Sequence, residues 1–186
     1  MKILVSVFNN LYTDQRVEKF CKTLHENAYQ IEVIGNNWGG NPEMKRPYPF
    51  SRISLHSKKL RFAYLEFQWK LFFELLKKAD RNTILHANDL DALLPNYLVS
   101  KIKGIPLVWD SHEIFTEMPT VTNRWVQHVW RLLENALIRK IKYFITANDS
   151  YANWFETNYK IKRPIVIEIF LKNQNHRRIS LKTIRK

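Results

Sequence analysis

The sequence predicts a doubly wound, mostly parallel α/β sheet in a single domain, and three observations support this prediction. Apolar segments of strand length alternate repeatedly with longer segments of helical periodicity, which is the pattern of a parallel sheet covered by helices. The chain contains no internal repeat and no obvious linker. With 186 residues, 45% of them hydrophobic, it is long enough to bury a substantial core without disulfides.

The elements follow from local patterns along the chain. Residues 2–8 form a continuous apolar run rich in Val and Ile, which is typical of a buried strand. Asp14 is placed to cap the next helix, in which Val17, Cys21 and Leu24 share one face. Further strands are expected at residues 30–35, 50–55, 83–87, 105–109, 143–147 and 164–169. The helices are expected at residues 14–27, 60–78, 90–103, 124–142 and 149–158.

The net charge of +13 is the strongest signal in the composition. It favours an anionic partner, which can be nucleic acid, an acidic membrane surface or a phosphorylated substrate. Residues 168–186 contain six Lys or Arg and one acid, Glu168, without helical periodicity. We therefore expect a folded domain over residues 1–167 and a basic, disordered tail over residues 168–186.

Cysteine content and hydropathy indicate the cellular compartment. The single cysteine, Cys21, excludes an internal disulfide and fits a reducing compartment. The apolar run at the start is too short for a secretory signal, and no run approaches the roughly 18 apolar residues of a spanning helix. These features predict a cytoplasmic protein, soluble or peripheral on the inner face of the cell membrane.

Four predicted strands are followed by polar residues, and in a parallel sheet these ends meet at one edge. The four polar segments are residues 9–10, 86–89, 110–113 and 148–150. Doubly wound sheets bind ligands in the crevice at this carboxyl edge. His112 near Asp110 is compatible with general acid–base chemistry, because imidazole titrates near neutrality and a carboxylate can hold its tautomer.

Each polar segment also has a purely structural interpretation. Asp110 or Ser111 can cap a helix, which leaves His112 and Glu113 without a role. The Asn and Asp residues at positions 88–89 and 148–149 can likewise be helix caps. His86, taken alone, fits a buried histidine better than a ligand-binding one.

Familiar cofactor motifs are absent from the sequence. Only four glycines are present, and no G-x-G-x-x-G follows the first strand. There is also no P-loop, no G-x-S-x-G nucleophile elbow and no Cys/His metal spacing. We therefore expect neither a metal nor a cofactor.

The segment at residues 58–78 is unusually rich in aromatic and basic residues. Its predicted core face carries Leu65, Trp69, Phe72 and Leu76. Other aromatic residues fall outside this stripe, and a helix that is aromatic on several faces and basic at its ends can lie on an anionic bilayer. The predicted membrane contacts are Phe62, Phe67, Lys58 and Lys59. A core helix with a solvated basic rim is the alternative.

Four segments in this order resemble glycosyltransferase family 4, a group of retaining GT-B enzymes that includes bacterial polysaccharide and lipid glycosyltransferases. The segments are residues 10–19, 86–95, 110–117 and 145–150, and the resemblance extends over residues 1–167. It implies a Rossmann-like, amino-terminal GT-B domain that binds the acceptor. The implied reaction transfers a sugar from a nucleotide-sugar to a glycan or lipid-linked acceptor.

The resemblance also implies roles for particular residues. It places His112 near the transferred sugar as the catalytic residue, and it places Asp14 and Arg16 in the same cleft. The predicted substrate-binding residues are Asn10, Asp14, Arg16, His86, Asp89, Asp110 and Glu113.

One departure from the family pattern is large. Complete enzymes of this kind have a second domain with an E-x7-E motif that binds the sugar nucleotide, and the present sequence ends where that domain should begin. We therefore expect a truncated chain or half-enzyme with little activity alone. The alternative is a basic module without catalytic activity that binds anionic membrane or nucleic acid, although no recognised nucleic-acid motif is present.

Overall fold

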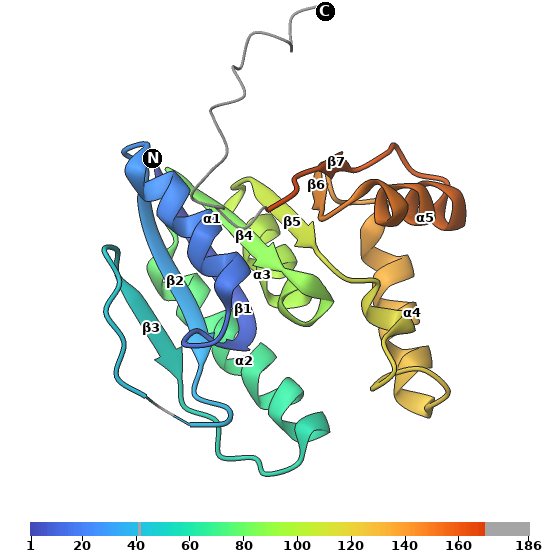
Figure 1. Ribbon diagram of the computed structural model, residues 1–186, viewed down its shortest axis with the longest axis horizontal. Coiled ribbons are helices and arrows are strands. Elements are labelled where there is room, and N and C mark those ends of the chain that lie inside the picture. The colour runs from blue at the N-terminus through green and yellow to red at the C-terminus, as the bar shows by residue number, and fades with distance from the viewer. Residues whose placement is uncertain (41, 170–186) are drawn as a thin grey trace, which may run out of the picture.

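Seven parallel strands form one sheet in the described part of the chain, residues 1–40 and 42–169 of a computed structural model (Figure 1). The strands are β1 (Lys2–Asn10), β2 (Gln30–Asn36), β3 (Phe50–Ile53), β4 (Thr83–Asn88), β5 (Leu107–Ser111), β6 (Tyr143–Thr146) and β7 (Ile165–Val166). The helices are α1 (Gln15–Glu26), α2 (Leu60–Lys78), α3 (Asp89–Lys103), α4 (Trp125–Ile138) and α5 (Asp149–Tyr159), with a short 3₁₀ helix η1 (Phe115–Glu117).

The strand order is β3-β2-β1-β4-β5-β6-β7, so the chain starts in the middle of the sheet and winds outward in both directions. The direction of winding reverses between β1 and β4, which are hydrogen-bonded neighbours. Such a reversal opens a crevice at the carboxyl ends of the two strands. The prediction of a doubly wound α/β sheet is confirmed, and every strand pair is parallel in the described residues.

Two hydrophobic clusters fill the two faces of the sheet. On one face, α1 places Val17 and Cys21 against alternate residues of β1 and β2. On the other face, α2 to α5 bury a larger cluster, in which Trp109 stacks on Phe144 at 4.3 Å between ring centroids. Cys21 is fully buried, and burial raises the pKa of its thiol to about 12, as expected for a packed cysteine.

Element boundaries differ from the expected ones where local hydrogen bonding intervenes. The strand expected from residue 105 begins at Leu107, because Pro106 has no N–H and the amide of Ile105 donates to the carbonyl of Ser100. Helix α3 begins at Asp89, one residue earlier than expected, and accommodates Pro95 in its interior. The last strand is shorter than expected, with only residues 165–166 paired.

The orientation of α2 corrects one sequence-based prediction. Its buried residues are Ala63, Phe67, Leu71 and Leu75. The predicted core residues Leu65 and Trp69 are instead 66% and 68% exposed. A shift of two residues rotates a helical position by about 200°, so Leu65 and Trp69 point away from the core. The other two predicted core residues, Phe72 and Leu76, are partly buried and pack against the core. The prediction that Phe67 contacts a membrane is therefore wrong, because this side chain is fully buried in the core.

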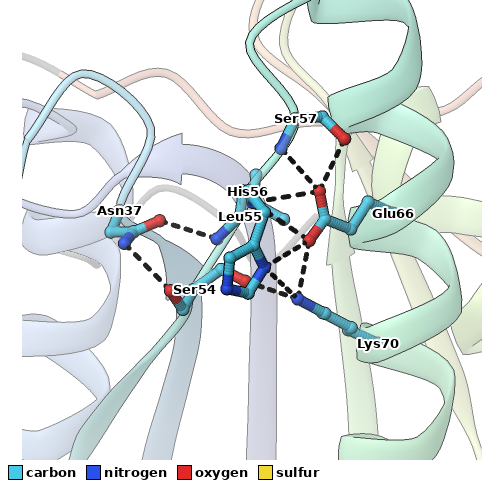
Figure 2. A network of polar contacts seen from close by, with 7 residues as sticks. All are labelled: Asn37, Ser54, Leu55, His56, Ser57, Glu66 and Lys70. Carbon is cyan, nitrogen blue, oxygen red and sulfur yellow. Dashed lines mark hydrogen bonds and ion pairs between the residues drawn. The ribbon is translucent and has the colours of Figure 1, made fainter.

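A polar network fixes the segment before α2 to the helix itself (Figure 2). The Glu66 carboxylate accepts hydrogen bonds from the amides of His56 and Ser57 and from Lys70 Nζ, the last at 2.6 Å. Lys70 also donates to the carbonyl of Ser54 at 2.7 Å. The hydrogen bonds from Lys70 and Ser57 hold the pKa of Glu66 well below its usual value. These hydrogen bonds fix residues 54–57 against the side of α2.

No helix among the described residues combines the length and the apolar character that crossing a bilayer requires. From residue 170 onward, the predicted tail at 168–186 lies outside the described residues.

Candidate active site at the carboxyl edge of the sheet

The polar strand ends predicted from the sequence meet where β1, β4 and β5 end. Asn88 is aligned with Asp110 in the β4–β5 register, and Ser6 is aligned with Ala87 in the β1–β4 register. The loop after β5 therefore lies beside the start of α3. This arrangement brings His112 within reach of Asp89, which is 23 residues away in sequence.

An ion pair between Arg16 and Asp110 joins α1 to the end of β5. Arg16 Nη2 lies 3.0 Å from Asp110 Oδ1 and 3.3 Å from Oδ2. The side chain of Asp110 is only 3% exposed and that of Arg16 is 18% exposed. A carboxylate buried to this degree needs a cation to offset the lost hydration, and Arg16 supplies it.

A second pair joins Asp89 at the start of α3 to His112. Asp89 Oδ2 lies 2.8 Å from His112 Nε2, and Asp89 Oδ1 accepts from the His112 amide at 3.2 Å. Burial disfavours the charged imidazolium, but the charge and hydrogen bond of Asp89 outweigh it and raise the pKa of His112. Asp89 has a left-handed backbone with φ of 58°, which Asp tolerates better than most residues.

Several buried polar atoms around the two pairs have no protein partner among the described residues. They include Arg16 Nε, His112 Nδ1 and Asp91 Oδ1. Buried polar atoms are normally hydrogen-bonded, so a group of unpartnered ones at the edge of a sheet is notable. With Nε2 held by Asp89, His112 Nδ1 is the buried ring nitrogen without a partner among the described residues.

Two further residues belong to this region and were not predicted from the sequence as site residues. Asp91 is 6% exposed, and burial together with the Asp89 charge raises the pKa of its carboxyl well above the usual value. Tyr64 of α2 is close enough that burial, Asp91, Asp89 and Glu113 all raise the pKa of its phenol. The pKa of Glu113 is raised by partial burial and by Asp89.

Two other predicted site residues have structural partners. Asn10 donates to the carbonyl of Gly40 at 3.0 Å and so fixes the loop after β2. Asp14 caps α1 by accepting from the Val17 amide at 2.9 Å, as predicted, and its other oxygen accepts from Asn9. A direct substrate contact for Asn10 and Asp14 stays a prediction.

His86 fits the alternative interpretation of a buried histidine. It is 2% exposed and stacks on Phe20 of α1 at 4.5 Å between ring centroids. Burial lowers its pKa to about 4, so it is neutral near pH 7. It lies beneath the site and packs α1 against β4.

The asparagines at the two remaining strand ends make different hydrogen bonds. Asn148 caps α5 by accepting from the Tyr151 amide at 2.9 Å, which confirms the structural interpretation of that segment. Asn88 makes no side-chain cap and instead donates to the carbonyl of Ser6 at 3.1 Å. Among the described residues, no group of three or more His, Cys, Asp or Glu side chains is arranged to hold a metal ion.

Comparison with known proteins decides the family. Residues 14–168 match the sequence model of Glycosyltransferase Family 4. The chain belongs to Glycosyltransferase Family 4. The match includes both charged pairs, and the fold is the α/β arrangement of a GT-B glycosyltransferase domain.

Solved structures agree on the fold. Sucrose-phosphate synthase from Thermosynechococcus elongatus superposes with a TM-score of 0.61 and 10% identity over 90% of this chain and 87% of that chain. UDP-GlcNAc 2-epimerase from Methanocaldococcus jannaschii gives a TM-score of 0.52 and 12% identity over 90% of this chain but 45% of that chain. At these identities the likeness concerns the fold alone. No curated protein sequence matches the chain.

Proposed function

We propose that this domain forms the acceptor side of a retaining GT-B glycosyltransferase, with His112 as the residue that contacts the reacting sugars. The observation that carries the proposal is the Asp89–His112 pair at the carboxyl edge of the sheet. Family membership supports sugar transfer as the reaction class. The acceptor and the stereochemical course are part of the proposal.

The proposed role of His112 follows from its surroundings. Asp89 holds Nε2 and favours the protonated ring, so Nδ1 becomes a hydrogen-bond donor toward a ligand oxygen. A sugar hydroxyl suits such a donor. Arg16 and Asp110 keep α1 and β5 at a fixed separation and so preserve the shape of the site.

The charged groups around His112 indicate that the phosphates of the sugar nucleotide are bound elsewhere. The guanidinium of Arg16 is committed to Asp110, and the other carboxyl groups near His112 are those of Asp89, Asp91 and Glu113. The first turn of α3, the helix that begins beside His112, carries Asp89 and Asp91, so this helix N-terminus does not offer a nucleotide diphosphate the uncommitted positive charge that it needs. We therefore propose that a sugar-nucleotide-binding domain completes the enzyme and that the 186-residue chain alone transfers sugar very slowly.

A carbohydrate array tests this proposal. The full chain is applied to immobilised glycans and glycolipids in wild-type form and as His112→Ala. His25→Ala is the matched control, because His25 is exposed near the far end of α1. We expect saturable binding to a subset of the array that His112→Ala weakens by about tenfold or more and the control leaves unchanged, since a lost charged hydrogen bond typically costs that much.

Two results would contradict the proposal. One is an array on which the wild type and the His112→Ala variant bind identically. The other is rapid sugar transfer from a common sugar nucleotide, such as UDP-glucose or GDP-mannose, by the purified chain alone.

A further inference from the structure

A groove with almost entirely apolar walls lies between α2 and α4. Its volume is about 430 Å³. The residues that form most of its walls are Phe62, Leu65, Leu94, Trp125, Val129 and Leu133. Leu65, Trp125 and Val129 are 66%, 67% and 52% exposed, so the groove presents large apolar side chains to water. An exposed and contiguous apolar surface of this kind marks a binding site more often than a bare protein surface.

The groove begins where the proposed active site ends. Helices α2 and α4 both start at the carboxyl edge of the sheet, and the groove is lined by the first three turns of each. Tyr64 is the link, because it lines the groove and also lies within electrostatic reach of Asp89 and Glu113. Its ring packs edge-on against Trp130, 5.5 Å away, which also lines the groove. Tyr64 therefore lies between the groove and the region of His112.

The rim of the groove is positively charged. Lys58, Lys59, Arg61 and Arg124 are all exposed at the starts of α2 and α4. None of them takes part in an ion pair recorded for the described residues.

The two helices add to this positive potential. Neither α2 nor α4 has an acidic residue in its first turn or a side-chain cap, so the positive ends of both helix dipoles are uncompensated. The nearest acid on α2, Glu66, is occupied by Lys70 and by residues 56–57 (Figure 2).

We propose that this groove binds the hydrocarbon chain of an acceptor lipid with an anionic headgroup while the lipid sits in a membrane. The apolar walls match the chain, and the basic rim matches the headgroup and the surrounding anionic lipids. This inference rests on the proposed function, because it specifies the acceptor as a lipid. Phe62, Lys58 and Lys59 keep the membrane role predicted from the sequence, and Leu65, Trp125 and Val129 take the place of Phe67.

Vesicle binding tests the groove with substitutions that leave the core untouched. The groove variant carries Leu65→Ser, Trp125→Ser and Val129→Ser. The matched control carries Trp69→Ser and Leu132→Ser, which lie on the same two helices, are 68% and 73% exposed, and do not line the groove. Circular dichroism establishes that both full-length variants fold.

Binding of each full chain is measured by sedimentation with vesicles of phosphatidylglycerol and phosphatidylcholine, and with vesicles of phosphatidylcholine alone. We expect the groove variant to bind the anionic vesicles at least about tenfold more weakly than the wild type, because transfer of even one large apolar side chain suffices for a tenfold change. The control should bind within about twofold of the wild type. The wild type should bind phosphatidylcholine vesicles more weakly than anionic ones.

Three outcomes would overturn the inference. The first is that the groove variant binds vesicles as tightly as the wild type. The second is that the control loses as much affinity for vesicles as the groove variant does. The third is that the groove variant loses self-association while its vesicle binding is unchanged. The last result would assign the groove to a second copy of the chain. Because vesicle binding requires no sugar, it can fail while array binding through His112 persists, which would remove the groove inference alone. The reverse result would leave a groove that binds membranes, but it would remove the proposed function and with it the assignment of the bound lipid as an acceptor.

Discussion

Carboxylates in two regions of this domain are removed from water in different ways. The edge site, defined by Arg16, Asp89, Asp110 and His112, pairs each carboxylate with a cation. The core cluster, defined by Glu134, Thr116 and Tyr159, gives a fully buried carboxylate only neutral contacts: the phenol of Tyr159 and, at 3.5 Å, the hydroxyl of Thr116.

The difference separates a site organised for ligands from a structural group. In the edge site the cations offset the cost of burial, and the two pairs hold Arg16 and His112 in place. In the core cluster burial dominates and raises the pKa of Glu134 to about 7. The charge of Glu134 therefore changes within the physiological range without any contact to the cleft.

The largest effect is expected from Arg16→Ala in the edge site. It leaves the buried Asp110 without its cation, and removal of one partner of a buried pair typically lowers the free energy of unfolding by about 3–5 kcal/mol. Urea unfolding measures the change. Lys22→Ala on the same helix is the control, because its pair with Glu26 is more than 60% exposed at both ends and should contribute less than about 0.5 kcal/mol. Equal effects of the two substitutions would remove the distinction between a buried and an exposed pair.

A smaller effect, confined to one pH range, is expected from Glu134→Gln in the core cluster. The folded protein retains the Glu134 proton up to about pH 7, whereas the unfolded chain loses it near the usual value of 4.5. The contribution of Glu134 is therefore fully present below about pH 4.5 and is lost as the pH rises to about 7. The loss is about 3 kcal/mol.

The test is to measure the free energy of unfolding of the wild type and of Glu134→Gln from pH 4 to 8. The difference between the two proteins should change between about pH 4.5 and 7. His86, whose pKa is lowered to about 4, produces the opposite slope between pH 4 and 6.5, but it does so in both proteins and cancels. A difference that is constant with pH would contradict the assignment of a raised pKa to Glu134.

The smallest effect on stability, and the most specific one on the site, is expected from Asp89→Asn. Asn accepts the left-handed backbone at position 89, so the free energy of unfolding should fall by less than about 1 kcal/mol. Loss of the Asp89 charge leaves burial as the dominant influence, so the pKa of His112 should fall. An NMR titration of the histidine ring measures it, with Glu26→Gln as the control, and an unchanged His112 titration would show that Asp89 does not set its charge.

The fold was largely predictable because hydrophobic periodicity and helix capping both depend on residues that are close together in the sequence. Alternation of apolar runs with helical periodicity gave the parallel sheet, and Asp14 and Asn148 cap their helices as the sequence indicates. The face of α2 was not predictable, because aromatic residues occur on all sides of it and periodicity alone does not choose between Phe67 and Trp69.

The site was predictable as a set of residues but not as pairs. Arg16 and Asp110 are 94 residues apart, and only the sheet order makes them neighbours. The buried acids Asp91 and Glu134 were missed because acidic residues were treated as caps or as surface. A signal for Glu134 did exist, since it lies four residues from both Trp130 and Ile138 and therefore on the apolar face of α4.

The most direct test of the acceptor-side function is an NMR titration of the full chain that follows the ring signals of His112. A glycan selected on the array is added in one experiment, and UDP-glucose or GDP-mannose in another. We expect the glycan to shift the His112 signals with saturation and the sugar nucleotides to leave them in place. Saturating shifts from a sugar nucleotide, with none from the glycan, would contradict the assignment of this domain to the acceptor.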